Sequence, residues 1–322
     1  MSNGRKAAAL AAVVVSLLVL VESRQTNYRL YFPIAYTADY GECVYSYKKG
    51  LAYSYPYQLE TSVAIQQDIC IRDSAYWRIW HYNKPNIYPN LTFVPTVWGR
   101  SQYESFINWY DASKNVTYIL IGNECDQADQ CNLTPQETAQ LFIDVLETCP
   151  PCLAIGPGLA SDETDGAWLF EWYQAYLQLG GDVDRLYAWD AHQYLHPTDA
   201  IPQEVYQTCL GKPVDDPCIA VAETQRRINR LYQVMPLDLP LFISEVGVCQ
   251  GFPTTYSWFG AVLDVLEADQ RVIAYLMFLD SGVGQPWQPC NFPIYTNGRL
   301  NSYGLAMRHA GSIHVLPGNP YP

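Results

Sequence analysis

Strand-like and helix-like stretches alternate along most of this chain, and the alternation constrains the fold more than any other feature of the sequence. Each short apolar run is followed by a longer amphipathic stretch or by a long loop, an order that predicts parallel strands covered by helices. We expect strands at residues 30–35, 76–82, 93–98, 118–124, 153–156, 185–194, 241–245 and 272–279.

Eight strands in this order predict a (β/α)8 TIM barrel, and 322 residues suit a single domain of that kind. The helix expected after residue 134 has the clearest start, because Thr134, Pro135 and Glu137 form a capping box with proline at the first position. Residues 197–217 are expected to be a Pro-rich loop. The other helices are expected at residues 57–71, 101–110, 168–179, 220–235, 256–269 and 303–309.

The N-terminus has the pattern of an export signal. Arg5 and Lys6 precede an apolar run over residues 7–21, which is shorter than the roughly 20 residues of a comfortable membrane span. We therefore expect a secretory signal peptide over residues 1–23, a mature domain over residues 24–322, and a secreted protein without stable membrane insertion. An uncleaved anchor that holds a structural protein at the cell surface is the alternative.

The 10 cysteines are an even number, which in an exported chain favours disulfides over free thiols or a metal site. The zinc interpretation of Cys149 and Cys152 is weak, because no second Cys-x-x-Cys accompanies them. Spacing suggests the pairs Cys125–Cys131, Cys149–Cys152 and Cys209–Cys218, which leaves Cys43–Cys70 and Cys249–Cys290.

The charge balance excludes one class of partner. A net charge of −13 argues against nucleic acid, whose phosphates are bound by clustered Lys and Arg. Serine-hydrolase chemistry finds little support, since the chain has no Gly-x-Ser-x-Gly pattern. Metallohydrolase chemistry finds little support either, since the chain has only 5 His and no His-Glu-x-x-His pattern.

Two of the expected strands deliver a glutamate at the C-terminal end. Glu124 follows Asn123 after one apolar run, and Glu245 follows Ser244 after another. Two carboxyl groups on rigid strand ends are the requirement of a retaining glycosidase, in which one is the acid/base and the other the nucleophile. Glu223, by contrast, is expected on the exposed face of a helix.

The order of the motifs resembles glycoside hydrolase clan A, and within it family 128, the endo-β-1,3-glucanases. The resembling residues are Tyr82-Asn83, Val94-Pro95-Thr96-Val97-Trp98-Gly99, Asn123-Glu124-Cys125-Asp126, His192-Gln193-Tyr194 and Ser244-Glu245-Val246. The resemblance spans roughly residues 76–280.

The resemblance implies a cofactor-independent, metal-free and monomeric enzyme that cleaves a polysaccharide, β-glucan. Glu124 would be the acid/base, Glu245 the nucleophile, and Tyr194 a hydrogen-bond donor to the nucleophile. The remaining residues implied to line the substrate site are Asn123, His192, Trp98, Tyr82, Asn83 and Trp287.

Several positions depart from the family pattern. Cys125 replaces a proline, Lys84 and Gln193 stand where tryptophan is common, and the last strand lacks a tryptophan platform, a role that Trp287 would fill. The glycan is therefore left open among β-glucan, mannan, galactan and xylan, and a glycan-binding protein on an inactive barrel is the alternative outside the enzymes.

Overall fold

Nine of the described strands form a ring in which every hydrogen-bonded pair is parallel. The computed structural model describes residues 45–53, 69–72, 75–79, 81–83, 90–160, 166–195, 201–210, 212–213, 216–249, 255–279, 295–296, 299–300 and 302–310, all within one compact unit over Glu42–Pro322. The sheet has nine strands in the order β3-β2-β1-β9-β8-β7-β6-β5-β4. Their bounds are Lys49–Tyr53 (β1), Tyr76–Ile79 (β2), Thr92–Val94 (β3), Thr96–Val97 (β4), Tyr118–Ile121 (β5), Leu153–Leu159 (β6), Leu186–Leu195 (β7), Leu241–Val248 (β8) and Val272–Leu279 (β9).

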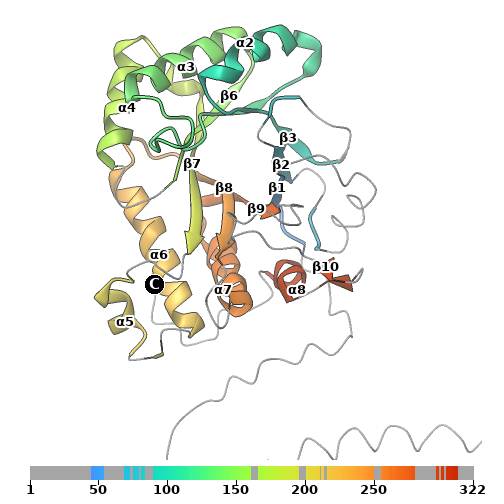
Figure 1. Ribbon diagram of the computed structural model, residues 1–322, viewed down its shortest axis with the longest axis vertical. Helices are drawn as coiled ribbons and strands as arrows, with labels where there is room; N and C mark the ends of the chain where they lie inside the picture. The colour runs from blue at the N-terminus through green and yellow to red at the C-terminus, as the bar shows by residue number, and fades with distance from the viewer. Residues whose placement is uncertain are drawn as a thin grey trace, which may run out of the picture. The chain divides into compact units, whose positions relative to one another are not determined.

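The two ends of this sheet are halves of one interrupted strand. Only Pro95 separates β3 from β4, and proline interrupts a strand because it has no N–H to donate. β3 pairs with β2, and β4 pairs with β5. The ring therefore has eight positions, which confirms the predicted (β/α)8 barrel (Figure 1).

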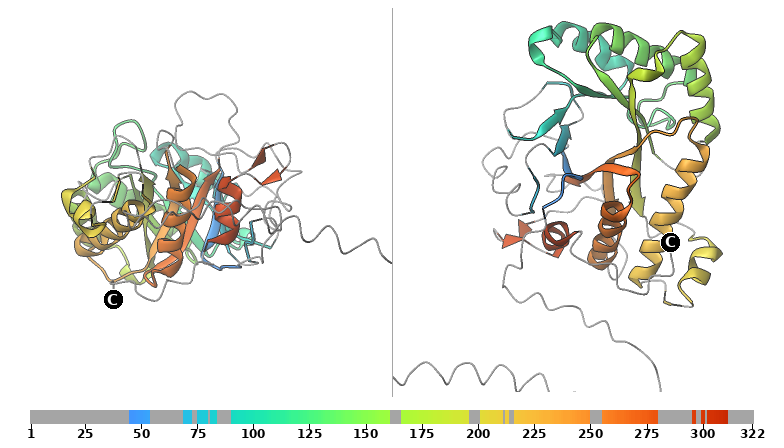
Figure 2. Two further views of the ribbon diagram at one scale, coloured as in Figure 1. Left: turned by 90° about the horizontal axis from the view of Figure 1, so that it is seen from below. Right: turned by 180° about the vertical axis from the view of Figure 1, so that it is seen from behind.

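The helices lie outside the ring of strands, as the opposite views of Figures 1 and 2 show. The predicted capping box is present at the start of α3, where the Thr134 hydroxyl accepts from the Glu137 N–H. The bounds are Arg100–Trp109 (α2), Pro135–Thr148 (α3), Gly166–Gln178 (α4), Gln203–Thr208 (α5), Pro217–Val234 (α6), Thr255–Ala268 (α7) and Ser302–His309 (α8), with short 3-10 turns at Ala112–Lys114 (η2) and Val183–Arg185 (η3) and a hairpin of Tyr295–Thr296 (β10) and Arg299–Leu300 (β11).

The first strand of the ring differs from the expected one. It is β1, within a stretch whose Tyr and Gly content suggests a loop, and it closes the barrel by pairing with β2 and with β9. The strand expected at residues 30–35 and most of the helix expected at 57–71 lie outside the described residues. The expected loop at 197–217 contains the helix α5.

Apolar side chains form two separate layers. A small cluster fills the barrel interior and includes Leu120, Ile155 and Phe242. A much larger cluster lies between the strands and the helices, where Trp172 of α4 meets Trp189 of β7 edge-on at 5.7 Å between ring centroids. Burial of such large side chains contributes about 2–3 kcal/mol each, so the outer layer holds the helices on the ring.

Three of the predicted disulfides are present, Cys125–Cys131, Cys149–Cys152 and Cys209–Cys218. Cys70 and Cys249 are also disulfide-bonded, but their predicted partners lie outside the described residues, as does the predicted signal peptide. These three bonds are consistent with an extracellular location. Among the described residues, no helix combines the length and apolar character needed to cross a bilayer.

Candidate active site

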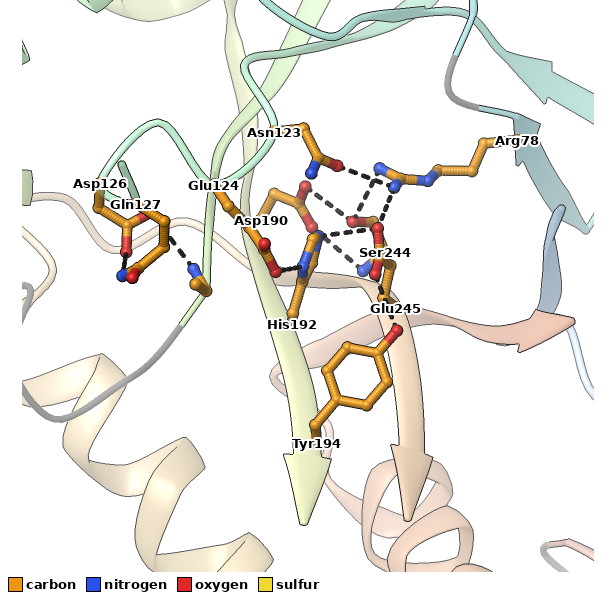
Figure 3. A network of polar contacts seen from close by, with 11 residues as sticks. Arg78, Asn123, Glu124, Asp126, Gln127, Asp190, His192, Tyr194, Ser244 and Glu245 are labelled. Carbon is orange, nitrogen blue, oxygen red and sulfur yellow. Dashed lines mark hydrogen bonds and ion pairs between the residues drawn. The ribbon is translucent and has the colours of Figure 1, made fainter. Parts of the chain in front are cut away.

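Side chains from four strands converge at the C-terminal end of the barrel, the end at which TIM-barrel enzymes carry their active sites. Figure 3 shows Arg78 from β2, Glu124 from the loop after β5, His192 from β7 and Glu245 from β8 directed toward one another. The two glutamates that follow apolar runs in the sequence therefore lie in one cluster (Figure 3), and their catalytic roles stay predictions.

The loop after β5 turns sharply to present Glu124. Gly122 has φ +79° and Glu124 has φ +49°, and a non-glycine residue in the left-handed region costs on the order of 1 kcal/mol. The Glu124 N–H donates to the Gly158 carbonyl of β6 at 2.8 Å, which holds the turn against the next strand.

The Cys125–Cys131 disulfide closes this loop immediately after Glu124. A Cβ on Gly122 would lie 2.9 Å from the Cys125 Sγ, so glycine is required both by its φ and by the space that the disulfide takes. The cysteine that departs from the family pattern thus anchors the loop carrying the carboxyl group.

An irregularity in the pairing of β7 with β8 aims two consecutive side chains of β8 into the site. Ala191 pairs with Ile243, but His192 pairs with Glu245, so Ser244 is the additional residue of a bulge. Consecutive residues of a regular strand face opposite sides, whereas a bulge re-aims them. Ser244 and Glu245 can therefore both reach the polar network.

Glu245 is held by donors on both oxygens. Its Oε1 accepts from Arg78 Nη2 at 2.5 Å, and its Oε2 accepts from the Tyr194 hydroxyl at 2.8 Å. The side chain is 8% exposed. The hydrogen bond that the resemblance implies between Tyr194 and Glu245 is thus present, and the guanidinium makes a charge-assisted hydrogen bond to the other oxygen.

Arg78 is the residue that the sequence analysis missed. Its side chain is fully buried, and besides Glu245 it donates to Asn123 Oδ1 and Ser244 Oγ, each at 3.1 Å. A signal was available, since an arginine between Trp77 and Ile79 stands in an otherwise apolar strand and charged groups are rarely buried without a partner.

Glu124 and His192 form a close ionic pair. His192 Nδ1 lies 2.5 Å from Glu124 Oε1, and its Nε2 lies 3.4 Å from Glu245 Oε1. Burial favours the neutral imidazole, but Glu245, Glu124 and Asp190 outweigh it and raise the pKa of His192 to about 9. Burial alone would raise the pKa of Glu124, but the charges of His192 and Arg78 and the hydrogen bond to His192 hold that pKa below its usual value.

A second layer of hydrogen bonds supports the bulge. The buried Asp190 accepts from the Ser244 N–H at 3.1 Å and from the Ser244 hydroxyl at 2.8 Å. Burial raises the pKa of Asp190, opposed by His192, Arg78 and the bonds from Ser244. Asp190 thereby fixes the residue that precedes Glu245.

The two carboxyl groups are near neighbours. The facing ligand atoms of Glu124, His192 and Glu245 all lie within 4.8 Å of one another. Three such groups could hold a cation, but the raised pKa of His192 and the guanidinium on Glu245 Oε1 oppose one, since a metal requires neutral imidazole. The expectation of no metal stays a prediction.

The remaining predicted substrate residues are scattered. Trp98, half-buried after β4, accepts a backbone hydrogen bond from the Asn123 N–H, whereas Tyr82 packs into the core against Phe106 and Trp109. Asn83 is exposed and lines a separate cavity of about 420 Å³. Trp287 lies outside the described residues, and the binding roles of all these residues stay predictions.

Comparison with known proteins adds independent evidence. The family model described as "Glycosyl hydrolase catalytic core" matches residues 50–214. No curated protein matches the sequence.

Solved structures with the same fold include several GH128 enzymes. A subgroup I endo-β-1,3-glucanase from Amycolatopsis mediterranei, in complex with laminaritriose, has a TM-score of 0.61 at 20% identity, covering 83% of this chain and 100% of that one. A subgroup II endo-β-1,3-glucanase from Sorangium cellulosum has a TM-score of 0.59 at 20% identity, covering 82% and 98%. A subgroup III curdlan-specific exo-β-1,3-glucanase from Blastomyces gilchristii has a TM-score of 0.52 at 16% identity, covering 81% and 97%.

Proposed function

The chain belongs to the glycosyl hydrolase catalytic core family, and on that premise we propose that it is a retaining β-glucanase in which Glu245 is the nucleophile and Glu124 the acid/base. The observation that carries the proposal is the approach of the facing atoms of both glutamates to within 4.8 Å. Retaining enzymes hold the two carboxyl groups about 5 Å apart, whereas inverting enzymes need roughly 6.5–9.5 Å to admit a water.

The surroundings of Glu245 suit a nucleophile. Arg78 and Tyr194 donate to its two oxygens, which fixes the direction of the carboxyl group. In the first step an oxygen of Glu245 attacks the anomeric carbon while the bond to the departing sugar breaks, giving a covalent glycosyl-enzyme.

The surroundings of Glu124 suit a group that both gives and takes a proton. At rest the proton is on His192, because the pKa of His192 is raised to about 9 and that of Glu124 is lowered. The two groups titrate as one pair, so that proton can cross the 2.5 Å contact to Glu124 as Glu124 protonates the departing oxygen. Glu124 then takes a proton from the water that releases the sugar from Glu245.

The substrate we propose is β-1,3-glucan cleaved within the chain. The motifs shared with family 128 and the β-1,3-glucanases of the same fold support this choice, including one crystallised with laminaritriose. The disulfides and the N-terminal signal pattern support secretion.

A polysaccharide panel tests this proposal. We expect the purified protein to release short oligosaccharides from laminarin and curdlan faster than from mannan, galactan or xylan, and NMR to find the β-anomer first. Glu245→Ala and Glu124→Gln should each lower kcat by about 1,000-fold or more while both variants stay folded at the assay temperature, which circular dichroism checks. Release of the α-anomer, or near-normal turnover by either variant, would overturn the assignment.

A further inference from the structure

A charged cluster on α6 lies behind the active site, on the outer side of the barrel wall. Glu223, expected to be exposed, is only 1% exposed and takes ionic hydrogen bonds from two arginines of the same helix. Arg226 donates to both carboxylate oxygens at 2.8 and 2.9 Å, and Arg227 Nε donates to Oε1 at 2.7 Å. A buried carboxylate needs such partners, but one bidentate arginine would already satisfy much of that need.

Arg227 connects this cluster to the barrel. Its Nη1 donates to the backbone carbonyl of Tyr194 at 2.8 Å, while its Nε is held by Glu223. Because the guanidinium is planar and rigid, fixing one edge on Glu223 fixes the direction of the other donors. The position of the Tyr194 backbone is therefore tied to α6.

Tyr194 links the outside of the barrel to the proposed nucleophile. It is the last residue but one of β7, where Tyr194 pairs with Gly247 and Leu195 with Val248 of β8. Its carbonyl meets Arg227, and its hydroxyl donates to Glu245 Oε2 at 2.8 Å. A shift of this strand end would carry the hydroxyl away from Glu245.

We propose that Arg227, oriented by Glu223, is a positioning residue that fixes the orientation of the Glu245 carboxyl group through Tyr194. This inference rests on the proposed function, since it assigns a remote determinant of the same nucleophile. Attack on the anomeric carbon needs near-ideal placement, and a displacement of about 1 Å can cost on the order of 100-fold in rate.

The chain supplies a matched control one residue away. Arg226 binds the same carboxylate from the same helix, whereas Arg227 also donates to the Tyr194 carbonyl. We expect Arg227→Gln to lower kcat on laminarin by about 10- to 100-fold with KM within about two-fold. Arg226→Gln should leave kcat within about two-fold, and Arg227→Lys, which keeps the charge but not the planar fork, should lose nearly as much as Arg227→Gln.

A double-mutant cycle separates positioning from general destabilisation. In a Tyr194→Phe background, which lacks the hydroxyl that transmits the effect, Arg227→Gln should change kcat by no more than about two-fold. Any of three outcomes would overturn the positioning role. These are the full loss of kcat by Arg227→Gln in the Tyr194→Phe background, equal losses of kcat for the Arg226 and Arg227 variants, and undiminished turnover by Arg227→Gln. If Arg227→Gln fails to fold, Arg227→Lys carries the same cycle.

Different measurements refute the proposed function and the positioning role of Arg227. An unmodified protein that turns over no polysaccharide refutes the proposed function, and the positioning role with it. An active unmodified protein with an additive double-mutant cycle refutes the positioning role alone.

Discussion

The two ends of the barrel differ in the side chains that the same strands carry there. Near their starts, β2, β5 and β7 place three tyrosines in the barrel interior, Tyr76, Tyr118 and Tyr187. Toward the C-terminal end, the same strands and the loop after β5 carry charged groups, Arg78, His192 and Glu124 (Figure 3). The tyrosine rings lie in contact, with centroids 5.8 Å apart for Tyr76 and Tyr118 and 4.4 Å apart for Tyr118 and Tyr187.

The two regions differ in how their polar groups are satisfied. The Tyr76 and Tyr187 hydroxyls share a hydrogen bond of 3.3 Å, and burial raises the pKa of Tyr187 to about 12, so this end stays neutral at ordinary pH. The other end holds buried charges that stabilise one another, because Arg78 lies against Glu245 and His192 lies against Glu124. Loss of one group should therefore be costly at the charged end and mild at the tyrosine end.

The largest expected effect is that of Arg78→Met. It leaves the buried Glu245 without its guanidinium partner, and breaking a buried ion pair costs about 3–5 kcal/mol of unfolding free energy. We also expect kcat to fall by about 100-fold or more, because an electrostatic partner of the reacting carboxylate is lost. Urea unfolding and laminarin turnover measure both.

The double variant Arg78→Met/Glu245→Gln provides the control for this explanation. Since it removes the unpaired charge as well, it should recover much of the stability that Arg78→Met loses. A double variant that is less stable than Arg78→Met alone would contradict the explanation that the buried charges at this end of the barrel stabilise one another.

The next effect is a pH dependence of stability centred on His192. Its pKa is raised from 6.5 to about 9 in the folded protein, so its stabilising contribution is complete below pH 6.5 and is lost as pH rises through about 9. The free energy of unfolding should fall by an amount on the order of 1–3 kcal/mol between pH 6.5 and 8. The unfolding temperature, which is the quantity measured, should fall with it.

His192→Gln isolates that contribution, because its unfolding temperature should change less over the same interval. Measurement above pH 8 is less informative, since burial lowers the pKa of Lys49 to about 8 and this group adds stability as pH rises from there. Parallel pH profiles for the unmodified protein and the variant would contradict the prediction.

The smallest effect is expected at the tyrosine end. Tyr187→Phe removes one hydroxyl from a shared hydrogen bond and should cost about 0.5–1.5 kcal/mol of unfolding free energy. Because the ring stays in place, kcat should remain within about two-fold of the unmodified value. A loss of turnover comparable with that of Arg78→Met would show that the two ends are not independent.

The sequence predicts best what depends on local pattern. The start of β8 and all of β9 are apolar runs, as expected of strands that are buried on both faces. The same local pattern identifies Glu124 and Glu245, because each is a carboxyl group that follows an apolar run, although Glu245 lies within β8 and not after its end. The capping box of α3 is equally local, since Thr134 and Glu137 satisfy each other.

What the sequence does not predict depends on pairing between distant segments. β1 contains Lys49 and Gly50, poor strand residues, yet a Cβ on Gly50 would lie 2.4 Å from the Tyr76 carbonyl, so the glycine is required by the approach of β2. The bulge at Ser244 exists only in the register of β7 with β8. Burial of Glu223 likewise depends on how α6 packs on the barrel.

The interruption at Pro95 has a consequence for association with other chains. Exposed strand edges offer unpaired N–H and C=O groups to neighbouring molecules, and proteins restrict them because such edges promote aggregation. Here the two terminal strands of the sheet, β3 and β4, are consecutive in the chain. A proteolytic cut beside Pro95 would remove the covalent link between these two ends of the sheet, and β3 would then be held by its pairing with β2 and β4 by its pairing with β5.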